Sequence, residues 1–522
     1  MTIVTATVSV MVSNSASSVE VVVVGAGISG IRVAIELLRL GCQSFVLLEA
    51  AAELGGTWRD NTYPGIAVDI LSVSYCFPFE TDFAWSREFA PGAEIQRYVR
   101  HCADKYGVLP HIRYQARVLR CVWDAAADQW TTHLADGGAL VSRYVVAATG
   151  LLSQPKLPDI AGLETFAGTT MHTARWDHSL DLRDRRVAIV GTGASAVQII
   201  PKIAQQVAAL RIFQRTPIWV SPRLDRALRP DSMLRLRRFA VVRGLLRWLS
   251  ELGLELVTFS IVNYQKMPWF VQAIQHLVRA WMRTQVDDPA VAARLLPQYG
   301  LGCKRPTTSN TYLKTFNLPH VQLVTEAIAR IVPQGVITAD GALHDVDTLI
   351  LATGFLTTEQ GNGPSFKVIG QDETELGQFW QDRRLQAYAG VAVPGFANFF
   401  LTAGPYSGGF NWFTMLEAHV SLIGRCLGAA RSSGMTRVQV KLAAHQRYMQ
   451  RMWSRSQGTV FTAAACQGSH SYYIDRHGDA SLPLPHTPWW RALWLRWRPL
   501  DAFEMTAKSR PVAEASSAQE AP

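Results

Sequence analysis

Glycines near the start of the chain have the spacing of a phosphate-binding loop. Gly25, Gly27 and Gly30 follow directly on the apolar run Val21–Val24 and open a helix-periodic stretch that ends near Gly41. The first glycine permits a tight turn, the second lets a pyrophosphate approach the backbone, and the third allows close packing of helix on strand. Free N–H groups at a helix N-terminus attract the phosphates. This segment therefore predicts a strand, loop and helix that bind a dinucleotide.

An acid completes this first unit. Glu49 ends a second apolar run, Ser44–Leu48, and lies 19 residues after Gly30. A carboxylate at that distance accepts hydrogen bonds from an unmodified ribose 2′-OH. We therefore expect the first unit to bind the adenosine half of FAD or NAD.

The pattern recurs after the apolar run Arg186–Val190. The second loop consists of Gly191, Thr192, Gly193, Ala194, Ser195 and Ala196, with alanine in the third glycine's place. The same 19-residue step past the last of these leads to Arg215, which Thr216 follows. A guanidinium can hold a ribose 2′-phosphate through two hydrogen bonds, so the second unit is expected to bind NADP(H). The alternative for Arg215 is a solvated surface charge.

The order of the two units predicts the architecture. Each unit is closed by an apolar strand that ends in Ala-Thr-Gly, at residues 145–150 and 349–354. We expect an α/β fold with two Rossmann-like domains, the NADP domain being inserted in the FAD domain. The expected divisions are an N-terminal extension (1–18), the FAD domain (19–153 and 354–505), the NADP domain (154–225 and 301–353), a helical insertion (226–300) and a disordered tail (506–522).

Within the expected insertion, charged side chains recur every four residues. Arg243, Arg247, Glu251 and Glu255 alternate with leucines, which predicts an amphipathic helix with a charged stripe. The favoured interpretation is a helical insertion packed on the nucleotide domain. Because basic and aromatic residues lie nearby in the sequence, contact with a membrane surface is the less favoured alternative. These neighbours are Arg235, Arg237, Arg238, Trp248, Trp269 and Trp281.

Composition excludes several classes of protein. The chain has 522 residues, is 48% apolar, and carries 51 Lys and Arg against 41 Asp and Glu, a net charge of +10. It has no uncharged apolar stretch of about 18 residues and no lysine-rich tail, which argues against a membrane-spanning protein and makes nucleic acid the weakest partner. Seven cysteines without a CxxC argue against thioredoxin-like chemistry and zinc sites, so no metal is expected. The first basic residue is Arg32, so a secretory leader is not indicated and a reducing cytoplasm is expected.

Two longer motifs carry a resemblance to a known family. Residues 166–177, FAGTTMHTARWD, match the pattern FxGxxxHxxxW(P/D), and residues 55–69, GGTWRDNTYPGIAVD, match (A/G)GxWxxxx(F/Y)P(G/M)xxxD. With the glycine loops, the matches run from about residue 20 to 420. The chain resembles the flavoprotein monooxygenases of the Baeyer–Villiger type, relatives of the flavin-containing monooxygenases. The Trp176-Asp177 ending favours the Baeyer–Villiger group.

The resemblance implies cofactors and a reaction. NADPH would reduce FAD, the reduced flavin would capture O2 as a C4a-peroxide, and this oxidant would convert an apolar ketone to an ester or lactone. The alternative is oxygenation of a soft sulfur or nitrogen atom, as in flavin-containing monooxygenases. A flavin reductase that passes electrons to a partner is disfavoured because no CxxC exists, and a nucleotide-sensing module without turnover is a further alternative. Substrate identity and oligomeric state stay open.

The resemblance also assigns roles to residues. Cys303-Lys304-Arg305-Pro306 is similar to the family segment with the active-site arginine. It implies that Arg305 stabilises the peroxyflavin, that Asp69 orients Arg305, and that Lys304 joins Arg215 on the 2′-phosphate. The alternatives are a solvated Lys-Arg pair and a helix-capping aspartate.

Further residues are expected around the flavin and between the domains. Gly56, Thr57, Trp58 and Tyr75 lie in or just beyond the second motif and are expected near FAD, as is Asp69. His172 and Trp176 of the first motif are expected to couple the movement of the two domains. The alternative for His172 is a buried structural histidine.

Overall fold

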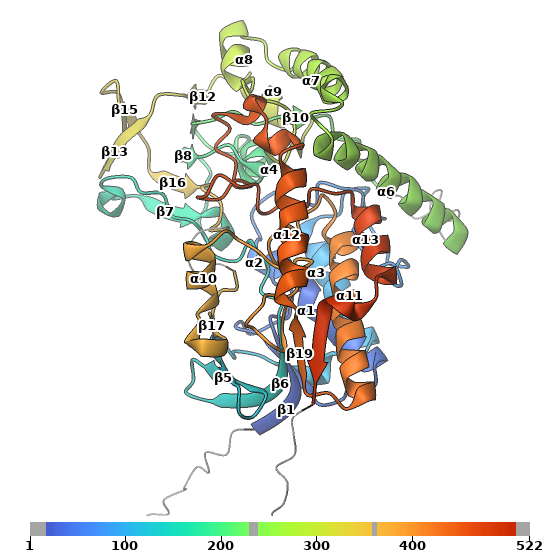
Figure 1. The fold of residues 1–522 in the computed structure, drawn as a ribbon. Helices are drawn as coiled ribbons and strands as arrows, with labels where there is room; N and C mark the ends of the chain where they lie inside the picture. Colours follow the sequence, from blue (N-terminus) through green and yellow to red (C-terminus); the bar gives the residue numbers. More distant parts are fainter. Residues whose placement is uncertain (1–16, 229–238, 358–362, 508–522) are drawn as a thin grey trace, which may run out of the picture.

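The computed structural model describes residues 17–228, 239–357 and 363–507. The expected N-terminal extension and disordered tail lie almost entirely outside the described residues, as do Arg235, Arg237 and Arg238. The two large sheets of the described chain, a mixed one and a parallel one, lie in the lower and the upper part of Figure 1. The α/β fold class and the two Rossmann-like units expected from the sequence are confirmed.

The first sheet is built around the strand that precedes the first glycine loop. Strand β1 (Ser17–Val24) pairs in parallel with β2 (Phe45–Leu48) and with β6 (Ala139–Ala147), and β2 pairs with β3 (Ile112–Arg113). Val21–Val24 of β1 are buried on both faces, as expected of a central parallel strand. Helix α1 (Ile28–Arg39) follows β1 directly and covers one face of the sheet.

Antiparallel strands extend this sheet on its other side. Strands β4 (Val118–Asp124) and β5 (Gln129–Leu134) form a meander with β6. The chain returns to the sheet about 220 residues later through β17 (Lys367–Ile369), which pairs with β4, and β18 (Phe399–Leu401), which pairs with β6. The first domain is thus assembled from two separate pieces of the chain.

The second sheet lies between these two pieces in the sequence. Its five strands are all parallel, in the order β12 (Val321–Val324), β9 (Ala209–Phe213), β8 (Arg186–Val190), β16 (Thr348–Leu351) and β7 (Thr169–His172). Helix α4 (Ala194–Ile203) follows β8 across the second glycine loop. A small antiparallel sheet of β13 (Ile328–Val332), β14 (Gly335–Thr338) and β15 (Leu343–Asp345) projects from it.

Helices fill the insertion in the second domain. Strands β10 (Val220–Ser221) and β11 (Thr307–Thr308) pair at its base. Between them lie α6 (Ala240–Val262), α7 (Pro268–Arg283) and α8 (Pro289–Leu295), with α9 (Tyr312–Thr315) just beyond. The charged stripe of α6 faces inward: Arg247 donates to the Cys76 carbonyl at 3.0 Å, and Glu251 accepts from Asn411 at 2.6 Å. The insertion packs on the core of the second domain through Ile261 and Val278, and the stripe of α6 in addition bonds to the first domain.

The C-terminal part of the chain is mainly helical. Helix α11 (Trp412–Ser433) contacts α1 and α13 (Pro488–Trp497), and β19 (Arg437–Val440) pairs with β20 (Phe503–Thr506). The other α-helices among the described residues are α2 (Thr57–Asp60), α3 (Gly92–Lys105), α10 (Leu376–Asp382) and α12 (Leu442–Ser456). Short 3-10 turns lie at Leu109–His111, Leu163–Thr165, Thr173–Arg175, Gln371–Glu373, Val460–Thr462, Ala464–Cys466 and Leu500–Ala502. In the described part of the chain, every helix is too short or too polar to cross a bilayer.

One disulfide joins segments that are distant in the sequence. Cys303 and Cys466 are bonded, 163 residues apart, and the other five cysteines are free and buried. Cys303 immediately precedes Lys304 and Arg305, and Cys466 lies just before His470 and Tyr472. The sequence analysis did not anticipate this bond, because cysteines at such a separation carry no spacing signal.

Candidate active site

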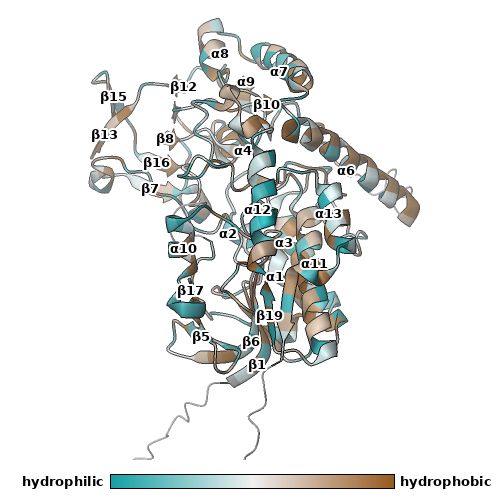
Figure 2. Ribbon diagram, viewed as in Figure 1, coloured by the Kyte–Doolittle hydropathy of each residue, from teal (hydrophilic) through white to brown (hydrophobic). Residues whose placement is uncertain are grey.

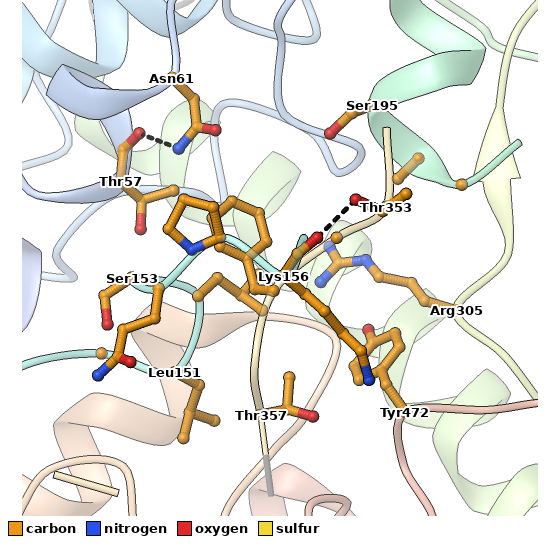
Figure 3. Close-up of a pocket in the computed structure, with 18 of the residues that line it drawn as sticks. Thr57, Asn61, Leu151, Ser153, Lys156, Ser195, Arg305, Thr353, Thr357 and Tyr472 are labelled. Carbon is orange, nitrogen blue, oxygen red and sulfur yellow. Dashed lines mark hydrogen bonds between the residues drawn. The ribbon is translucent and has the colours of Figure 1, made fainter. Parts of the chain in front are cut away.

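A cavity of about 1910 Å³ is lined by residues of both domains. Its size exceeds the roughly 300–1,000 Å³ of a pocket for one drug-sized ligand. Both glycine loops lie on its wall, together with the Ala-Thr-Gly segments that end the two closing strands. Figure 3 shows residues from either domain around one part of this cavity, among them Thr57 and Asn61 from the first and Ser195 and Arg305 from the second.

The first glycine loop has the geometry of a pyrophosphate cradle. Gly25 has a φ of +107°, and a Cβ there would lie 2.7 Å from the Ala148 carbonyl oxygen. A Cβ on Gly30 would lie 1.9 Å from the Gly25 oxygen, so helix and strand approach closely only because this residue is glycine. Gly27 is the N-cap of α1 without a capping side chain, which leaves backbone N–H groups for a phosphate. These features fit FAD.

Glu49 lies at the end of β2 and is buried. One carboxylate oxygen accepts the Ala26 N–H at 2.9 Å, and the other accepts the Ala51 N–H at 2.9 Å and the Arg59 guanidinium at 2.8 Å. The carboxylate is thus fixed between the glycine loop and α2, and its oxygens retain lone pairs for a ribose. Arg59 was missed by the sequence analysis because it occupies a variable position of the longer motif.

The second motif forms a wall beside this loop. Gly56 has a φ of +57° and starts α2, and the Asn61 amide donates to the Thr57 carbonyl at 2.9 Å (Figure 3). The Trp58 indole donates to the Tyr75 hydroxyl at 3.2 Å. Burial raises the pKa of Tyr75 to about 12, so this hydroxyl stays protonated at neutral pH. The five residues named from sequence for the flavin, Gly56, Thr57, Trp58, Asp69 and Tyr75, all line the cavity.

The second loop is open at its second glycine. Gly193 is the N-cap of α4, and no atom lies within 4 Å of a Cβ built on it. Gly191 has a φ of +104° and, like Ala194 and Ser195, lines the cavity. The empty space above the N-terminus of α4 fits a pyrophosphate.

Two cations stand at the far end of this loop. Arg215 and Thr216 follow β9 and line the cavity, and Lys304 lies close enough for the Arg215 charge to act on it. Burial, and then the Arg215 charge, lowers the pKa of Lys304 to about 8. Neither cation forms an ion pair with an acid among the described residues. Two neighbouring cations without a carboxylate favour an anionic ligand such as a 2′-phosphate.

Arg305 and Asp69 come together across the cavity. The Nε of Arg305 lies 3.0 Å from a carboxylate oxygen of Asp69, which comes from the first domain 236 residues away. This carboxylate raises the pKa of Arg305, against the effect of burial. Tyr472, Tyr473 and Tyr75 lie within electrostatic reach of the guanidinium, and Figure 3 shows Arg305 between Thr353 and Tyr472. The ion pair thus holds the Arg305 guanidinium in a fixed position on the cavity wall.

His172 and Trp176 are placed outside the cavity. His172 ends β7, is buried, and accepts the Ala174 N–H at its Nδ1 at 3.0 Å. Burial lowers the pKa of His172, which favours the neutral ring. Its ring contacts Phe355 edge to face, and Trp176 packs on the core of the second domain. The coupling role assigned to the two residues stays a prediction.

Comparison with known proteins identifies the family. A model of the flavin-binding monooxygenase-like family matches residues 18–270. A Baeyer–Villiger monooxygenase of Streptomyces coelicolor is 36% identical over 90% of this chain and 89% of the relative. A second, from Pseudomonas aeruginosa, is 32% identical over 95% and 93% of the two chains.

The chain belongs to the Baeyer–Villiger monooxygenase family. The resemblance based on the two motifs is therefore confirmed. Solved structures agree: cyclohexanone monooxygenase from Rhodococcus sp. Phi1, bound to NADP+, matches with a TM-score of 0.84 at 26% identity, covering 94% of this chain and all of that one. A steroid monooxygenase bound to NADP matches with a TM-score of 0.83, also at 26% identity and with the same coverage.

The C-terminal segment adds residues to this Baeyer–Villiger site that the sequence analysis missed. His470 contacts the Thr216 hydroxyl at 3.2 Å, and Tyr472 and Tyr473 line the cavity beside Arg305. This segment contains no motif, and the disulfide that holds it near Arg305 has no local sequence signal. At the start of α11, the Trp412 indole donates to the Ser29 hydroxyl of the first loop at 3.1 Å.

Proposed function

We propose that this chain oxidises an apolar ketone to an ester or lactone. The overall reaction consumes ketone, O2, NADPH and a proton and yields the ester or lactone, NADP+ and water. The observation that carries the proposal is the Arg305–Asp69 pair, a fixed cation in a cavity lined by two dinucleotide loops. The chain is an FAD- and NADPH-dependent monooxygenase of the Baeyer–Villiger family, and the expected enzyme class and cofactors are confirmed.

The two loops would hold the two cofactors. Gly25, Gly27 and Glu49 would hold the pyrophosphate and ribose of FAD, with Trp58 and Tyr75 nearer the flavin. Gly193, Arg215 and Lys304 would hold NADPH by its pyrophosphate and 2′-phosphate. When bound, NADPH supplies a hydride and reduced FAD supplies the electrons that activate O2.

Arg305 supplies positive charge where oxygen transfer develops negative charge. Arginine keeps its proton under all ordinary conditions, so it can stabilise an anionic oxidant without protonating it. The ion pair with Asp69 fixes the guanidinium in place before the reaction, which avoids the cost of reorganisation. Lys304 is unsuited to this role because its pKa is about 8.

The substrate region is expected to be apolar. The cavity wall includes Ile261, Val262, Phe410, Trp412 and Phe461. Such side chains bind apolar groups and exclude water from the reacting atoms. An apolar ketone is therefore the proposed substrate class.

The test compares ketones with thioethers. Purified protein with NADPH and O2 should convert apolar ketones to products heavier by one oxygen, and Arg305→Ala should lower this rate at least about 1,000-fold, a loss of roughly 4 kcal/mol of transition-state stabilisation. Sulfoxide formation that survives in Arg305→Ala, without ester formation in the wild type, would overturn the ketone assignment. In the absence of oxygen, NADPH should bleach the bound flavin in either case. A chain without turnover would not show this bleaching.

The cytoplasm stays the proposed compartment. Five of the seven cysteines are free and buried, as is common where thiols are kept reduced, whereas the Cys303–Cys466 disulfide is of a kind that is rare there. Recovery of the protein with cytoplasmic markers during cell fractionation would support this location, and export to the medium would contradict it.

A further inference from the structure

A short segment of the first domain, residues 62–67, reaches into the second domain. It belongs to the longer motif and ends two residues before Asp69. Its Tyr63 is 7% exposed and belongs to the hydrophobic core of the second domain, on which Ile66 also packs. The first domain thus crosses the domain boundary directly before the carboxylate that holds Arg305.

The backbone of this segment lies against helix α4. Gly65 has a φ of +86°, and a Cβ there would lie 2.7 Å from the Gln198 carbonyl oxygen and 3.0 Å from the Lys202 side chain. Any other residue would strain the backbone and push the helix away. Helix α4 lies at the boundary between the two domains (Figure 2), and most of its apolar residues are buried in the second core. The two domains therefore meet backbone to backbone at this point.

Gln198 is the residue of α4 that bonds the segment. Its Nε2 donates to the Ala67 carbonyl at 2.9 Å, and its Oε1 accepts the Ala67 N–H at 3.4 Å. The same oxygen accepts from the Tyr63 hydroxyl at 3.2 Å. Burial raises the pKa of Tyr63 to about 12, so this hydroxyl keeps its proton at neutral pH. One side chain thus makes three hydrogen bonds across the domain boundary.

These bonds connect two parts of the active site. Gln198 lies one turn after the N-terminus of α4, where the pyrophosphate of NADPH is expected. Its partner Ala67 lies two residues before Asp69, which fixes Arg305 at 3.0 Å. The amide of Gln198 therefore sets the distance between the NADP loop and the Asp69–Arg305 pair.

Hydride transfer depends on this distance. The reacting atoms must approach to about 3–3.5 Å, and a misplacement of about 1 Å can cost roughly 100-fold in rate. NADPH is expected on the second domain and FAD on the first, so the placement of one domain on the other enters the rate. Apolar packing of Tyr63 has no preferred direction, whereas hydrogen bonds hold their partners at one distance and angle.

We propose that Gln198 is a positioning residue, which holds α4 and the NADPH bound there in register with the flavin and with the Asp69–Arg305 pair. It acts through the backbone of Ala67. Loss of its amide should slow hydride transfer, while the affinity for NADP+ and the FAD content stay close to those of the wild type. Flavin reduction by NADPH requires no ketone, so its rate reports on Gln198 independently of the proposed substrate.

Mixing the purified FAD-bound enzyme with NADPH in the absence of oxygen provides the first measurement. Gln198→Met keeps the length of the side chain and removes its hydrogen bonds. Flavin bleaching should slow about 10–100-fold, with the Kd of NADP+ within about threefold of the wild-type value. The matched control is Gln265→Met, which should bleach at the wild-type rate. The Gln265 amide also donates to a distant backbone carbonyl, that of Gln457 at 2.6 Å, but lies outside the cavity.

Hydrogen exchange measures the same connection without turnover. NADP+ bound at α4 should slow the exchange of backbone amides in residues 62–69 of the wild type. In Gln198→Met this protection should fall at least about tenfold, while protection of the loop at residues 191–195 is kept. Gln265→Met should behave as the wild type does.

Several results would overturn the proposal. Bleaching at the wild-type rate in Gln198→Met would exclude a positioning role, as would equal protection of residues 62–69 in that variant and the wild type. A Kd for NADP+ raised about tenfold or more would instead make Gln198 a direct ligand of the nucleotide. If Gln198→Met fails to fold, Gln198→Asn keeps the amide on a shorter side chain and should show the same slow bleaching; a wild-type rate there would also overturn the proposal.

Discussion

At the scale of single residues, three cations in one cavity have different chemical surroundings. Arg305 is paired with Asp69 at 3.0 Å, whereas Arg215 and Lys304 repel each other. A paired guanidinium is a permanent positive charge held in one position. An unpaired lysine beside another cation gains from binding an anion. The electrostatics therefore assign Arg305 to oxygen transfer and the other two to a phosphate.

The role of Asp69 can be measured through its charge. Asp69→Asn keeps the shape of the side chain but frees the guanidinium to move, so we expect kcat to fall about 10–100-fold, a loss of roughly 1.4–2.7 kcal/mol. The KM for NADPH should change less than about threefold. Asp82→Asn is the control, because Asp82 pairs with Arg243 outside the cavity. An equal loss in both variants would contradict a positioning role.

Lys304 predicts a pH dependence of NADPH binding. The pKa of Lys304 is lowered to about 8, and a bound 2′-phosphate would raise it by favouring the charged form. Affinity for NADP+ should therefore be full below pH 8 and fall as the pH rises above 8, by at most about tenfold per pH unit. Binding of NAD+, which lacks the phosphate, should not follow this curve.

Titration of NADP+ between about pH 7 and 10 provides the measurement. Lys304→Met should remove the pH dependence and reduce the preference for NADP+ over NAD+ by about tenfold, roughly 1.4 kcal/mol. An unchanged preference in that variant would contradict the assignment of Lys304 to the 2′-phosphate.

At the scale of elements, the two strand-loop-helix units use glycine differently. In β1–α1, the third glycine, Gly30, is needed because the Gly25 oxygen lies where a Cβ would be. In β8–α4, Ala196 takes this place, and Gly193 faces open space. Both units need their first glycine, because a Cβ on Gly25 or Gly191 would lie within 2.7 Å of a backbone oxygen, and only the first unit needs a third glycine for packing.

Two alanine substitutions distinguish the packing role of Gly30 from the ligand-binding role of Gly193. Gly30→Ala should disturb the packing of α1 on β1 and give protein without FAD, with a melting temperature lowered by several degrees. Gly193→Ala should leave the melting temperature within about 2 °C of the wild type, while its methyl group raises the dissociation constant of NADP+ about tenfold or more, roughly 1.4 kcal/mol. Thermal melting and flavin absorbance provide the readouts. Normal NADP+ affinity in Gly193→Ala would place the pyrophosphate elsewhere.

Much of the nucleotide-binding architecture could be predicted because its signals are local. The run Arg186–Val190 and its loop matched β8 and α4 closely, since burial, turn and helix start all lie within about 20 residues. The return of β18 to β6 had no such signal, because a strand of three residues has too little pattern. The stripe of α6 was visible in the sequence, but periodicity does not tell which side faces the protein.

The same difference between local and distant signals holds for the residues of the site. Arg305 and Asp69 could be paired only through the family resemblance, since 236 residues separate them. Arg59 was missed because it occupies a variable position of the longer motif, and Tyr472 and Tyr473 were missed because their segment contains no motif.

At the scale of the whole molecule, the Cys303–Cys466 bond fastens the segment that carries Arg305 to the C-terminal wall of the cavity. Closing a loop of 163 residues restricts the unfolded chain. Replacing both cysteines by serine should therefore lower the free energy of unfolding by about 2–4 kcal/mol.

Denaturation with and without reductant measures this effect. Reductant should shift the unfolding midpoint of the wild type toward that of the double variant and leave the double variant unchanged. A wild-type midpoint that is insensitive to reductant, at full reduction of the thiols, would contradict a stabilising bond.

The divided first sheet also bears on how the molecule is synthesised. Strand β6 ends at Ala147, but its neighbour β18 begins only at Phe399. At about 5–20 residues per second, a ribosome needs roughly 10–50 s to make the intervening chain of about 250 residues. All strands of the second sheet lie within this intervening chain. The second domain can therefore fold first, while one edge of β6 still has no partner strand. During those seconds the growing chain depends on nearby structure, or on chaperones, to keep that edge from pairing with a neighbouring nascent chain.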